Sequence, residues 1–313
     1  MMDFRIPFGS WVEAGLDWIE DNLDWLFDLL AAVYVALYDA VVWVVATPPA
    51  VVVIAVLAVL ALAARGWRFG LGTALGLLFI VGVDQWDNAM ETLALVVVAA
   101  FLAIVVAVPL GIWAARSDRV SAVIKPVMDF LQTMPAFVYL IPAIGLFGIG
   151  VAPGIFATVL FALAPGVRLT ELGIRGVDRE VVEAGQAFGS TPGRILRQIQ
   201  LPLAMPSIMA GINQVIMLSL SMVVIAGMVG AGGLGGDVTK SLSALDTALG
   251  FEAGLSVVIL AIILDRFTGA FGMKRGLHLI RRLRARGRAD DAATTASSPG
   301  ATAPSTARDT VAA

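Results

Sequence analysis

Residues 130–167 read FLQTMPAFVYLIPAIGLFGIGVAPGIFATVLFALAPGV, a run of 38 residues without a charged side chain. As one helix this run would measure about 57 Å, nearly twice the ~30 Å thickness of the hydrocarbon core of a bilayer. Pro153 and Gly154 lie near its middle, and this pair favours a reversal of the chain. The stretch therefore predicts two membrane-spanning helices, over residues 131–150 and 152–169, joined by a turn.

The composition of the whole chain supports the same class. Hydrophobic residues make up 59% of it and charged residues only 14%, against about 25% charged residues in a soluble domain. This balance excludes a soluble enzyme, a disordered chain and a nucleic-acid-binding protein. We predict an all-α polytopic membrane protein with about seven transmembrane helices, over 49–65, 69–84, 91–115, 131–150, 152–169, 207–230 and 252–272. Pro202 and Pro206 place the start of the sixth helix at Ser207.

The basic residues predict how the chain is oriented. Basic residues in short loops favour the cytoplasmic side. With the N-terminus outside and the C-terminus in the cytoplasm, only Arg5 and Lys240 of the 21 Lys and Arg residues lie outside. The reverse orientation would place nearly all of them on the wrong side. We therefore expect a multi-pass protein of the bacterial plasma membrane with its C-terminus inside.

The two ends of the chain have different characters. Near the N-terminus, tryptophans repeat every seven residues at Trp11, Trp18 and Trp25, beside a row of aspartates. This pattern predicts an amphipathic helix on the outer membrane surface within residues 1–48, as an anchor or as a lure for cations. Residues 273–313 are first basic and then small and polar, which predicts a disordered cytoplasmic tail. Its arginines are a topology signal or a site for anionic lipid.

A long polar segment, residues 170–206, separates the fifth and sixth predicted spans. It is too long for a simple connector, and such loops usually carry function. We expect a short helix that ends at Gly189, and a second that begins at Thr191-Pro192 and stops at Pro202. Val182 and Phe188 have no apparent core of their own, so the loop predicts a protein partner on the cytoplasmic face.

The spacing of this segment resembles the EAA loop of ABC importer permeases. Glu183-Ala184-Gly185 is followed by three residues, a glycine, nine residues and then Ile199-Gln200-Leu201-Pro202. Gly185, in place of the second alanine, is the one departure. In that family the loop forms a coupling helix that docks in a groove of the ATP-binding subunit. The resemblance implies this role for Glu183, Ala184, Gly185, Phe188, Gly189, Ile199, Leu201 and Pro202.

Further segments resemble the permeases of glycine betaine/proline betaine ABC importers. They are 132–150 (QTMPAFVYLIPAIGLFGIG), 201–214 (LPLAMPSIMAGINQ), 220–236 (LSMVVIAGMVGAGGLGG) and 257–266 (VVILAIILDR). The resemblance implies a type I ABC importer permease core over 86–272, preceded by two accessory transmembrane helices within 49–85. It also implies a second permease copy, two cytoplasmic ATPase subunits and an extracytoplasmic solute-binding protein.

The chain itself contains no Gly-x4-Gly-Lys-[Ser/Thr] motif to cradle ATP. We therefore expect ATP and Mg²⁺ on the separate ATPase chain. With no cysteine and one histidine, we expect no metal or cofactor bound by this chain and no catalytic residue.

Polar and aromatic side chains within the spans are candidates to line a translocation pathway, because such groups are costly in lipid. The candidates are Gln132, Thr133, Phe137, Tyr139, Asn213, Gln214, Ser219 and Ser221. Phe137 and Tyr139 could offer ring faces to a quaternary ammonium. Hydrogen bonds between helices explain the polar residues equally well, and packing explains Tyr139.

Three other readings of the sequence remain open. The nearest is an ABC permease for another cargo, such as choline, carnitine or methionine. An ion-coupled secondary transporter is expected to have internal repeats and acidic residues buried in the membrane, and the sequence shows neither. A membrane enzyme would need a cluster of catalytic side chains, which one histidine and few buried carboxylates do not supply.

Overall fold

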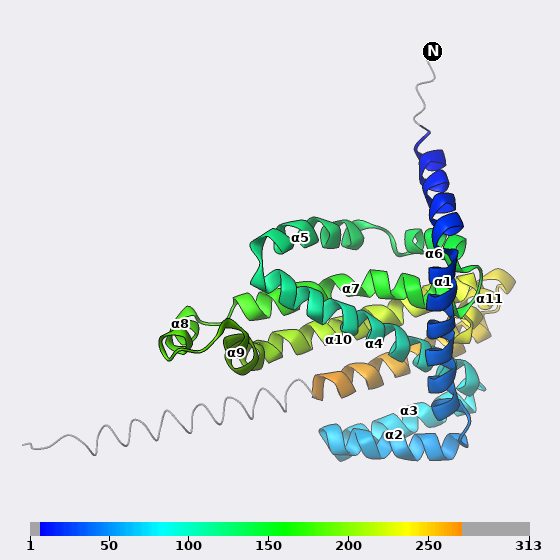
Figure 1. Ribbon diagram of the computed structural model, residues 1–313. Helices are drawn as coiled ribbons and strands as arrows, with labels where there is room; N and C mark the ends of the chain where they lie inside the picture. The colour runs from blue at the N-terminus through cyan, green and yellow to red at the C-terminus, as the bar shows by residue number, and fades with distance from the viewer. Residues whose placement is uncertain (1–6, 271–313) are drawn as a thin grey trace, which may run out of the picture.

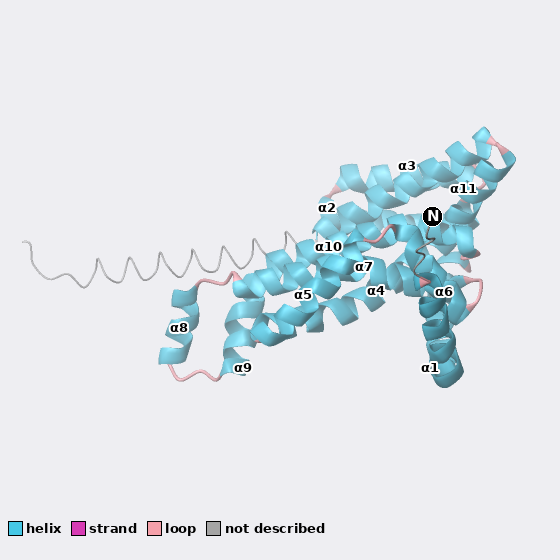
Figure 2. Ribbon diagram, turned by 90° about the horizontal axis from the view of Figure 1, so that it is seen from above, coloured by secondary structure: helices cyan, strands magenta, loops and turns pink. Residues whose placement is uncertain are grey.

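The computed structural model describes residues 7–270, and all regular structure in this part of the chain is helical (Figure 1). Most helices run side by side along one axis, and one long helix crosses that axis (Figure 1, Figure 2). The predicted all-α class is therefore confirmed. Arg5 and the predicted tail over 273–313 lie outside the described residues.

The crossing helix is α1 (Phe8–Ala46), which lies across the ends of the parallel helices (Figure 1, Figure 2). Its length and hydropathy would allow it to span a membrane, but its direction separates it from the helices that run along the common axis. Its first half extends beyond the bundle. This half exposes the three tryptophans of the heptad repeat, Trp11, Trp18 and Trp25.

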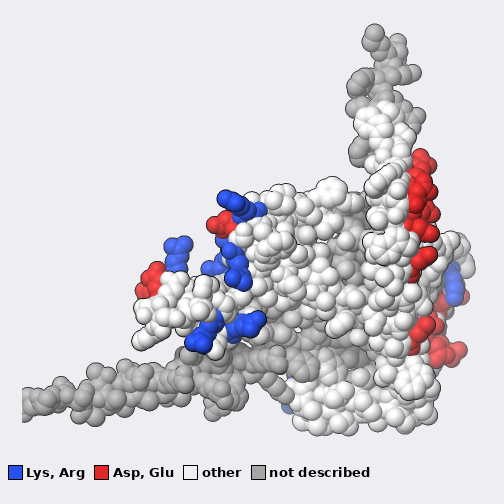
Figure 3. Space-filling view, viewed as in Figure 1, with Lys and Arg blue, Asp and Glu red and all other residues white. Residues whose placement is uncertain are grey.

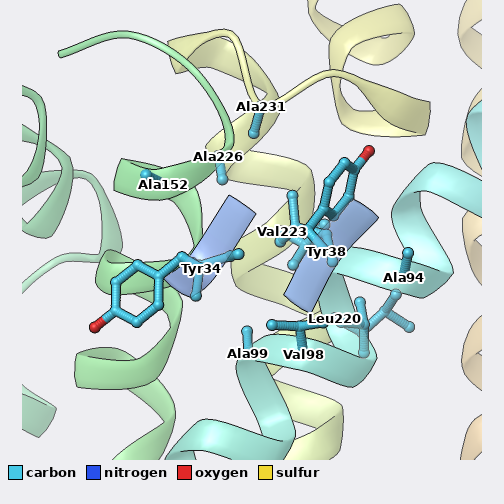
Figure 4. Packing of buried hydrophobic residues seen from close by; sticks show 13 residues of the cluster. Tyr34, Tyr38, Ala94, Val98, Ala99, Ala152, Leu220, Val223, Ala226 and Ala231 are labelled. Carbon is cyan, nitrogen blue, oxygen red and sulfur yellow. The ribbon is translucent and has the colours of Figure 1, made fainter. Parts of the chain in front are cut away.

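Two tyrosines fix the second half of α1 to the bundle. Tyr34 and Tyr38 are buried against α4 (Trp86–Arg116), α7 (Val151–Arg175) and α10 (Leu201–Ala226). In Figure 4 the two rings lie among small and branched side chains that these three helices contribute. The helix therefore belongs to the folded unit although it crosses the direction of the others.

After α1 the chain forms an antiparallel hairpin of two short apolar helices, α2 (Ala50–Arg65) and α3 (Trp67–Gly82). Gly66 allows the reversal because its φ is +95°, in the region that favours glycine. The predicted helices over 49–65 and 69–84 are confirmed to within two residues. At 16 residues each, they measure about 24 Å, slightly less than the ~30 Å hydrocarbon core.

The centre of the bundle is made by α4, α7 and α10, which approach one another closely at small residues. A Cβ on Gly111 of α4 would lie 2.6 Å from Cβ of Thr170, and one on Gly166 of α7 would lie 2.8 Å from Cβ of Ala107. Small residues let helix backbones approach in this way within a membrane. The predicted spans over 91–115 and 152–169 lie within α4 and α7.

The prediction of one continuous span over 131–150 is wrong. The chain there forms α5 (Asp118–Thr133), the 3₁₀ turn Ala136–Tyr139 and α6 (Leu140–Phe147), and the pair of helices is bent by 111°. Met134 precedes a proline and is therefore extended, with ψ 135°. As a result α5 runs along the common axis, whereas α6 lies beside α1 (Figure 1).

The predicted reversal at Pro153-Gly154 is also wrong. The chain reverses at Gly148 and Gly150, which have φ values of +71° and +142°. Pro153 lies instead in the first turn of α7, where a missing N–H costs nothing because no intrahelical acceptor exists for it. A proline followed by a glycine thus marks the helix start rather than the turn.

The sixth span begins earlier than predicted. The chain runs without a break from α9 (Pro192–Ile195) through a π-helical turn, Leu196–Gln200, into α10, so neither the stop at Pro202 nor the start at Ser207 is correct. In the π turn the Leu201 N–H donates to the Leu196 carbonyl, five residues back. The wider turn accommodates Pro202, which has no N–H to donate.

Beyond α10 a short 3₁₀ turn leads to α11 (Gly233–Ala244), within a segment predicted only as a loop. The last described helix covers Thr247–Ala270 and begins five residues before the predicted start at 252. Its end at 272 lies outside the described residues.

The helices α2, α3, α4, α5, α7, α10 and Thr247–Ala270 follow the common axis (Figure 1). Five helices of the described residues, α1 among them, are long and apolar enough to cross a membrane, or six if the bent α5–α6 pair is one span. The predicted number of about seven is reached when the shorter helices α2 and α3 are counted in place of α1. Charges separate along this axis (Figure 3). Acidic residues follow α1 at one end, and Lys and Arg gather at the other end around α8 (Arg179–Ala187) and α9.

Candidate functional site

The segment with the EAA-like spacing forms a helix–turn–helix at the basic end of the bundle, farthest from α1 (Figure 1, Figure 2). Asp178 caps α8, since its carboxylate accepts the Glu180 N–H at 3.0 Å. The helix ends at Ala187, and Gly189 has a φ of +74°. The end of this helix at Gly189 and the start of the next at Thr191-Pro192 are therefore confirmed.

Gly185 faces inward and holds the two helices of the loop together. It is buried, and a Cβ at this position would lie 2.8 Å from Cδ1 of Ile199 and 3.6 Å from Cγ1 of Ile195. The glycine thus lets α8 approach the π-helical turn more closely than an alanine would. The Gly185 carbonyl also accepts the Ser190 N–H at 3.1 Å, which closes the turn around Gly189.

The other predicted residues divide between the tip and the root of the loop. Glu183 and Ala184 are exposed at the tip, and the Phe188 ring is 90% exposed. At the root, Leu201 packs on a cluster that includes Ile174 and Leu196. The tip thus presents an uncovered apolar ring beside a carboxylate, on a base that is packed into the bundle.

A polar network that sequence reasoning missed joins this base to the neighbouring helices. The Glu171 carboxylate on α7 is 4% exposed and accepts from Ser121 of α5 at 2.7 Å and from the Arg175 guanidinium at 2.9 Å. Arg175 also donates to Asp118 at 2.7 Å and to the Ala114 carbonyl at 2.8 Å. One arginine at the start of the loop therefore ties α7 to both α4 and α5.

A second ion pair, Arg168 with Asp129, links α7 to α5 farther along. The ion pair between Glu171 and Arg175 could have been predicted from the sequence, because residues four apart lie next to each other on a helix. Their partners on α4 and α5 lie more than 45 residues away, beyond the reach of such patterns.

Unpaired basic side chains surround the root of the loop. Arg116, Arg194 and Arg197 line a cavity of about 510 Å³ next to α9. None of the three forms an ion pair with a carboxylate within the described residues 7–270. This surface suits a partner that brings acidic side chains.

The predicted pathway residues on α5 and the following turn fall into two environments. Gln132, Thr133 and Phe137 are exposed on the protomer. Tyr139 is buried, its hydroxyl donates to the Leu131 carbonyl, and its ring packs edge-on against Phe161 at 5.9 Å. Tyr139 therefore acts in packing in this conformation.

On α10 the four polar candidates also divide. Gln214 and Ser221 are seven residues apart, on one exposed face of the helix. Asn213 instead donates to Asp265 at 3.3 Å and accepts from Thr268, so it joins α10 to the last helix. Ser219 is fully buried. Of these four candidates, only Gln214 and Ser221 are exposed.

At the opposite end, α4 holds the start of α11. The Glu91 carboxylate accepts the Gly233 N–H at 3.0 Å, and the Thr92 hydroxyl accepts the Leu234 N–H at 2.8 Å. These contacts supply partners for amides that have none within the helix.

A buried carboxylate adds a second link between α11 and α4. Asp237 is 6% exposed and accepts from Asn88 at 2.5 Å and from Gln85 at 3.2 Å. The hydrogen bond from Lys240 to Asp237, at 2.8 Å, raises the pKa of Lys240. The sequence analysis missed this network, because Gln85 and Asn88 lie 152 and 149 residues from Asp237.

Comparisons with known proteins agree with this arrangement. The family model described as "Binding-protein-dependent transport system inner membrane component" matches residues 107–275. The glycine betaine/carnitine transport permease protein GbuB of Listeria monocytogenes is 46% identical over 273 residues, which cover 86% of this chain and 96% of that protein. The glycine betaine/proline betaine transport system permease protein ProW of Escherichia coli is 46% identical over 267 residues, covering 85% and 75%.

A solved structure shares the fold. An inward-facing conformation of the MetNI methionine ABC transporter aligns with a TM-score of 0.57 over 61% of this chain and 95% of the matched chain. The sequence identity is 20%, so this likeness speaks for the fold alone.

Proposed function

The chain belongs to the binding-protein-dependent transport system inner membrane component family, and from this premise we propose its cargo, its partners and the way its loop drives transport. It is the permease subunit of an ATP-driven importer for glycine betaine, proline betaine or a related compatible solute. The names of GbuB and ProW, both 46% identical to it, support this cargo. Such import would protect a cell against osmotic stress.

The exposed tip of α8 on a rigid base is the observation that carries the proposal. Phe188 is 90% exposed next to α8, which carries the exposed Glu183. Exposure of such an apolar side chain to water is unfavourable, and burial in a groove of a partner protein would remove it from water. The partner is an ATPase subunit, one for each of two permease copies, and it binds ATP and Mg²⁺. The unpaired arginines beside α9 add charge complementarity for an acidic rim on that subunit.

Two contacts carry motion from the loop into the bundle. Gly185 against Ile199 couples α8 to the helix that continues into α10. Arg175, bonded to Asp118 and the Ala114 carbonyl, couples α7 to α4 and α5. When the ATPase subunits close, a shift of the tip would therefore tilt the core helices as rigid bodies between inward-open and outward-open states.

The pathway would form between two permease copies. Gln214 and Ser221 on α10, with Gln132, Thr133 and Phe137 near the end of α5, are exposed on one protomer and available to line it. An extracytoplasmic solute-binding protein delivers the cargo to the end where α11 lies, and supplies most of the selectivity.

The proposed topology follows the separation of charges in Figure 3. Residues 1–48 lie outside with α1 on the membrane surface, 49–85 form two accessory transmembrane helices, and 86–272 form the permease core. The loop 170–206 and the tail 273–313 lie in the cytoplasm of a bacterial cell.

Charge reversal at the loop tip tests the docking surface. The complex with the ATPase and the binding protein is reconstituted, and ATP hydrolysis is measured with and without glycine betaine. We expect Glu183→Lys and Gly189→Val to abolish the solute-stimulated rate, the second because valine resists a positive φ. Glu13→Lys, the same charge reversal on exposed α1, is the matched control. Normal stimulation in both loop variants would refute this role of the loop.

The GbuB name supports carnitine as a second cargo. Competition between labelled glycine betaine and unlabelled carnitine, proline betaine, choline or methionine would rank these solutes. Inhibition by methionine but by no betaine would overturn the assigned class of cargo.

A further inference from the structure

The accessory hairpin α2–α3 meets the core unevenly and leaves an apolar groove. On one side α3 packs along the last helix: a Cβ on Gly76 would lie 2.8 Å from Ile259, and the Phe69 and Phe267 rings meet edge-on at 5.5 Å. On the other side α2 meets the core mainly through Val53 and Ile54. Between α1, α2, α4 and the last helix a cavity of about 560 Å³ remains.

The wall of this groove is hydrocarbon. It is lined by apolar side chains of four helices: Val41 and Val45 of α1, Leu57 and Leu60 of α2, Leu93 and Val97 of α4, and Leu264 and Phe267 of the last helix. Leu60 remains 51% exposed. In a transmembrane hairpin, such a groove opens sideways into the bilayer, so its natural occupant is apolar.

A basic side chain lies next to the end of the groove that points toward the loop α8–α9 (Figure 1). There the groove is lined by Ala64 and Ala270. Arg65, the last residue of α2, reaches across to the last helix, and its guanidinium nitrogen lies 3.2 Å from the place that a Cβ on Gly269 would take. Arg65 forms no ion pair with a carboxylate of residues 7–270.

The neighbouring residues mark this end as the level of lipid headgroups. The Arg68 guanidinium lies 5.7 Å from the centroid of the Trp67 ring, which is largely exposed. Tryptophan and arginine at the end of a short apolar helix are typical of the membrane–water interface. A charge and an apolar groove therefore meet at the depth where a phospholipid has its phosphate and the start of its chains.

We infer that this groove binds a phospholipid, with one acyl chain between α2 and α4 and an anionic headgroup on Arg65. An apolar helix of a second copy would bring no anion to Arg65, whereas a phospholipid supplies an acyl chain and a phosphate together. The inference rests on the proposed transmembrane placement of the hairpin and not on the cargo.

Filling the groove tests the acyl-chain site. Wild-type permease, Leu60→Trp and the control Val59→Trp are purified in detergent, and the phospholipid retained per protomer is measured by mass spectrometry. Val59 is the next residue, 64% exposed and outside the groove. We expect Leu60→Trp to lose the retained phospholipid and the control to keep it. Val97→Trp fills the groove from α4 and serves if Leu60→Trp fails to fold.

The headgroup contact is tested separately with Arg65→Gln in mixed micelles of phosphatidylglycerol and phosphatidylcholine. We expect the preference for phosphatidylglycerol to fall about fivefold, because one basic residue near an anionic surface contributes about 1 kcal/mol. Equal lipid retention in Leu60→Trp, Val97→Trp and Val59→Trp would overturn the site. So would a loss of dimers in the groove variants with retained lipid unchanged, since that result would place a second copy in the groove. Neither readout depends on transport, so a failure here leaves the transport assignment untouched.

Discussion

At the scale of single residues, the fixed spacing of the loop was the most informative part of the sequence. The predicted helix–turn–helix places Glu183, Gly189 and Leu201 correctly. The signals that set this motif are local in the sequence: Gly189 has a positive φ, and Pro192 follows Thr191 at the N-cap position. Contacts between distant residues were beyond such reasoning. Asn213 binds Asp265, 52 residues away, and no local pattern indicates that partner.

Arg175 is the residue whose loss should most affect coupling. Arg175→Ala removes hydrogen bonds to Asp118 and to the Ala114 carbonyl and leaves buried Glu171 with fewer partners. The hydrogen bond to buried Glu171 contributes about 1.5–3 kcal/mol, whereas the pair with Asp118, whose side chain is 93% exposed, contributes about 1 kcal/mol or less. We expect ATP hydrolysis to continue while the uptake per ATP hydrolysed falls.

The control for this prediction is Arg119→Ala, an exposed arginine of α5 that lies outside the docking loop and forms no ion pair among residues 7–270. Arg175→Lys should recover part of the uptake, because it keeps the charge beside Glu171. An unchanged ratio of uptake to hydrolysis in Arg175→Ala would show that the network only supports the fold.

Gly185 offers a graded test of the loop's internal packing. Gly185→Ala should be tolerated, because the atom 2.8 Å from the new Cβ is the terminal methyl of Ile199, which can rotate away. Gly185→Leu should displace α8 at a cost of about 1–3 kcal/mol. Co-purification of the ATPase subunit measures the effect, and equal recovery with alanine and leucine would contradict the packing.

At the scale of elements, the straight central helices could be predicted and the interrupted ones could not. The spans over 91–115 and 152–169 are long and apolar, with a single charged residue near one end of each, so hydropathy alone finds them. The segment 131–150 is just as apolar, yet the residue before Pro135 is extended and the helix breaks. Conversely Pro202 did not break its helix, because a π-helical turn precedes it. Hydropathy contains no information on the extended residue before Pro135 or on the π-helical turn before Pro202.

The start of α11 depends on a side chain of α4, which gives a test at the same scale. Thr92→Val removes the acceptor of the buried Leu234 N–H, and an unpaired buried donor costs about 1–3 kcal/mol. We expect faster hydrogen exchange over residues 233–237. Thr239→Val is the matched control, since that hydroxyl donates only to the Gly235 carbonyl within α11. Equal exchange in both variants would show that Thr92 does not hold the helix.

At the scale of the whole molecule, the few charges organise the protein. Acidic residues follow the crossing helix α1, and basic residues gather around α8 and α9 at the far end (Figure 3). The crosswise direction of α1 keeps it out of the bundle although its hydropathy would allow a span. The tryptophan and aspartate rows predict an amphipathic helix in this segment, and its place on the outer membrane surface stays a prediction.

The absence of cysteine from the chain makes its orientation directly measurable. In intact cells or spheroplasts, a membrane-impermeant maleimide should label Ser10→Cys on α1 without permeabilisation. It should label Ser190→Cys, in the turn after α8, only once the membrane is opened. The reverse pattern would invert the proposed topology and place the loop where no ATPase could reach it.

The central claim is that ATP hydrolysis on a partner subunit moves a compatible solute through this chain by way of the α8 loop. The most direct measurement is uptake of labelled glycine betaine into proteoliposomes that contain the permease, the ATPase and the binding protein, with and without ATP on the ATPase side. We predict uptake that requires ATP and is lost in Glu183→Lys. Uptake that proceeds without ATP on an ion gradient, or that persists unchanged in Glu183→Lys, would contradict the account.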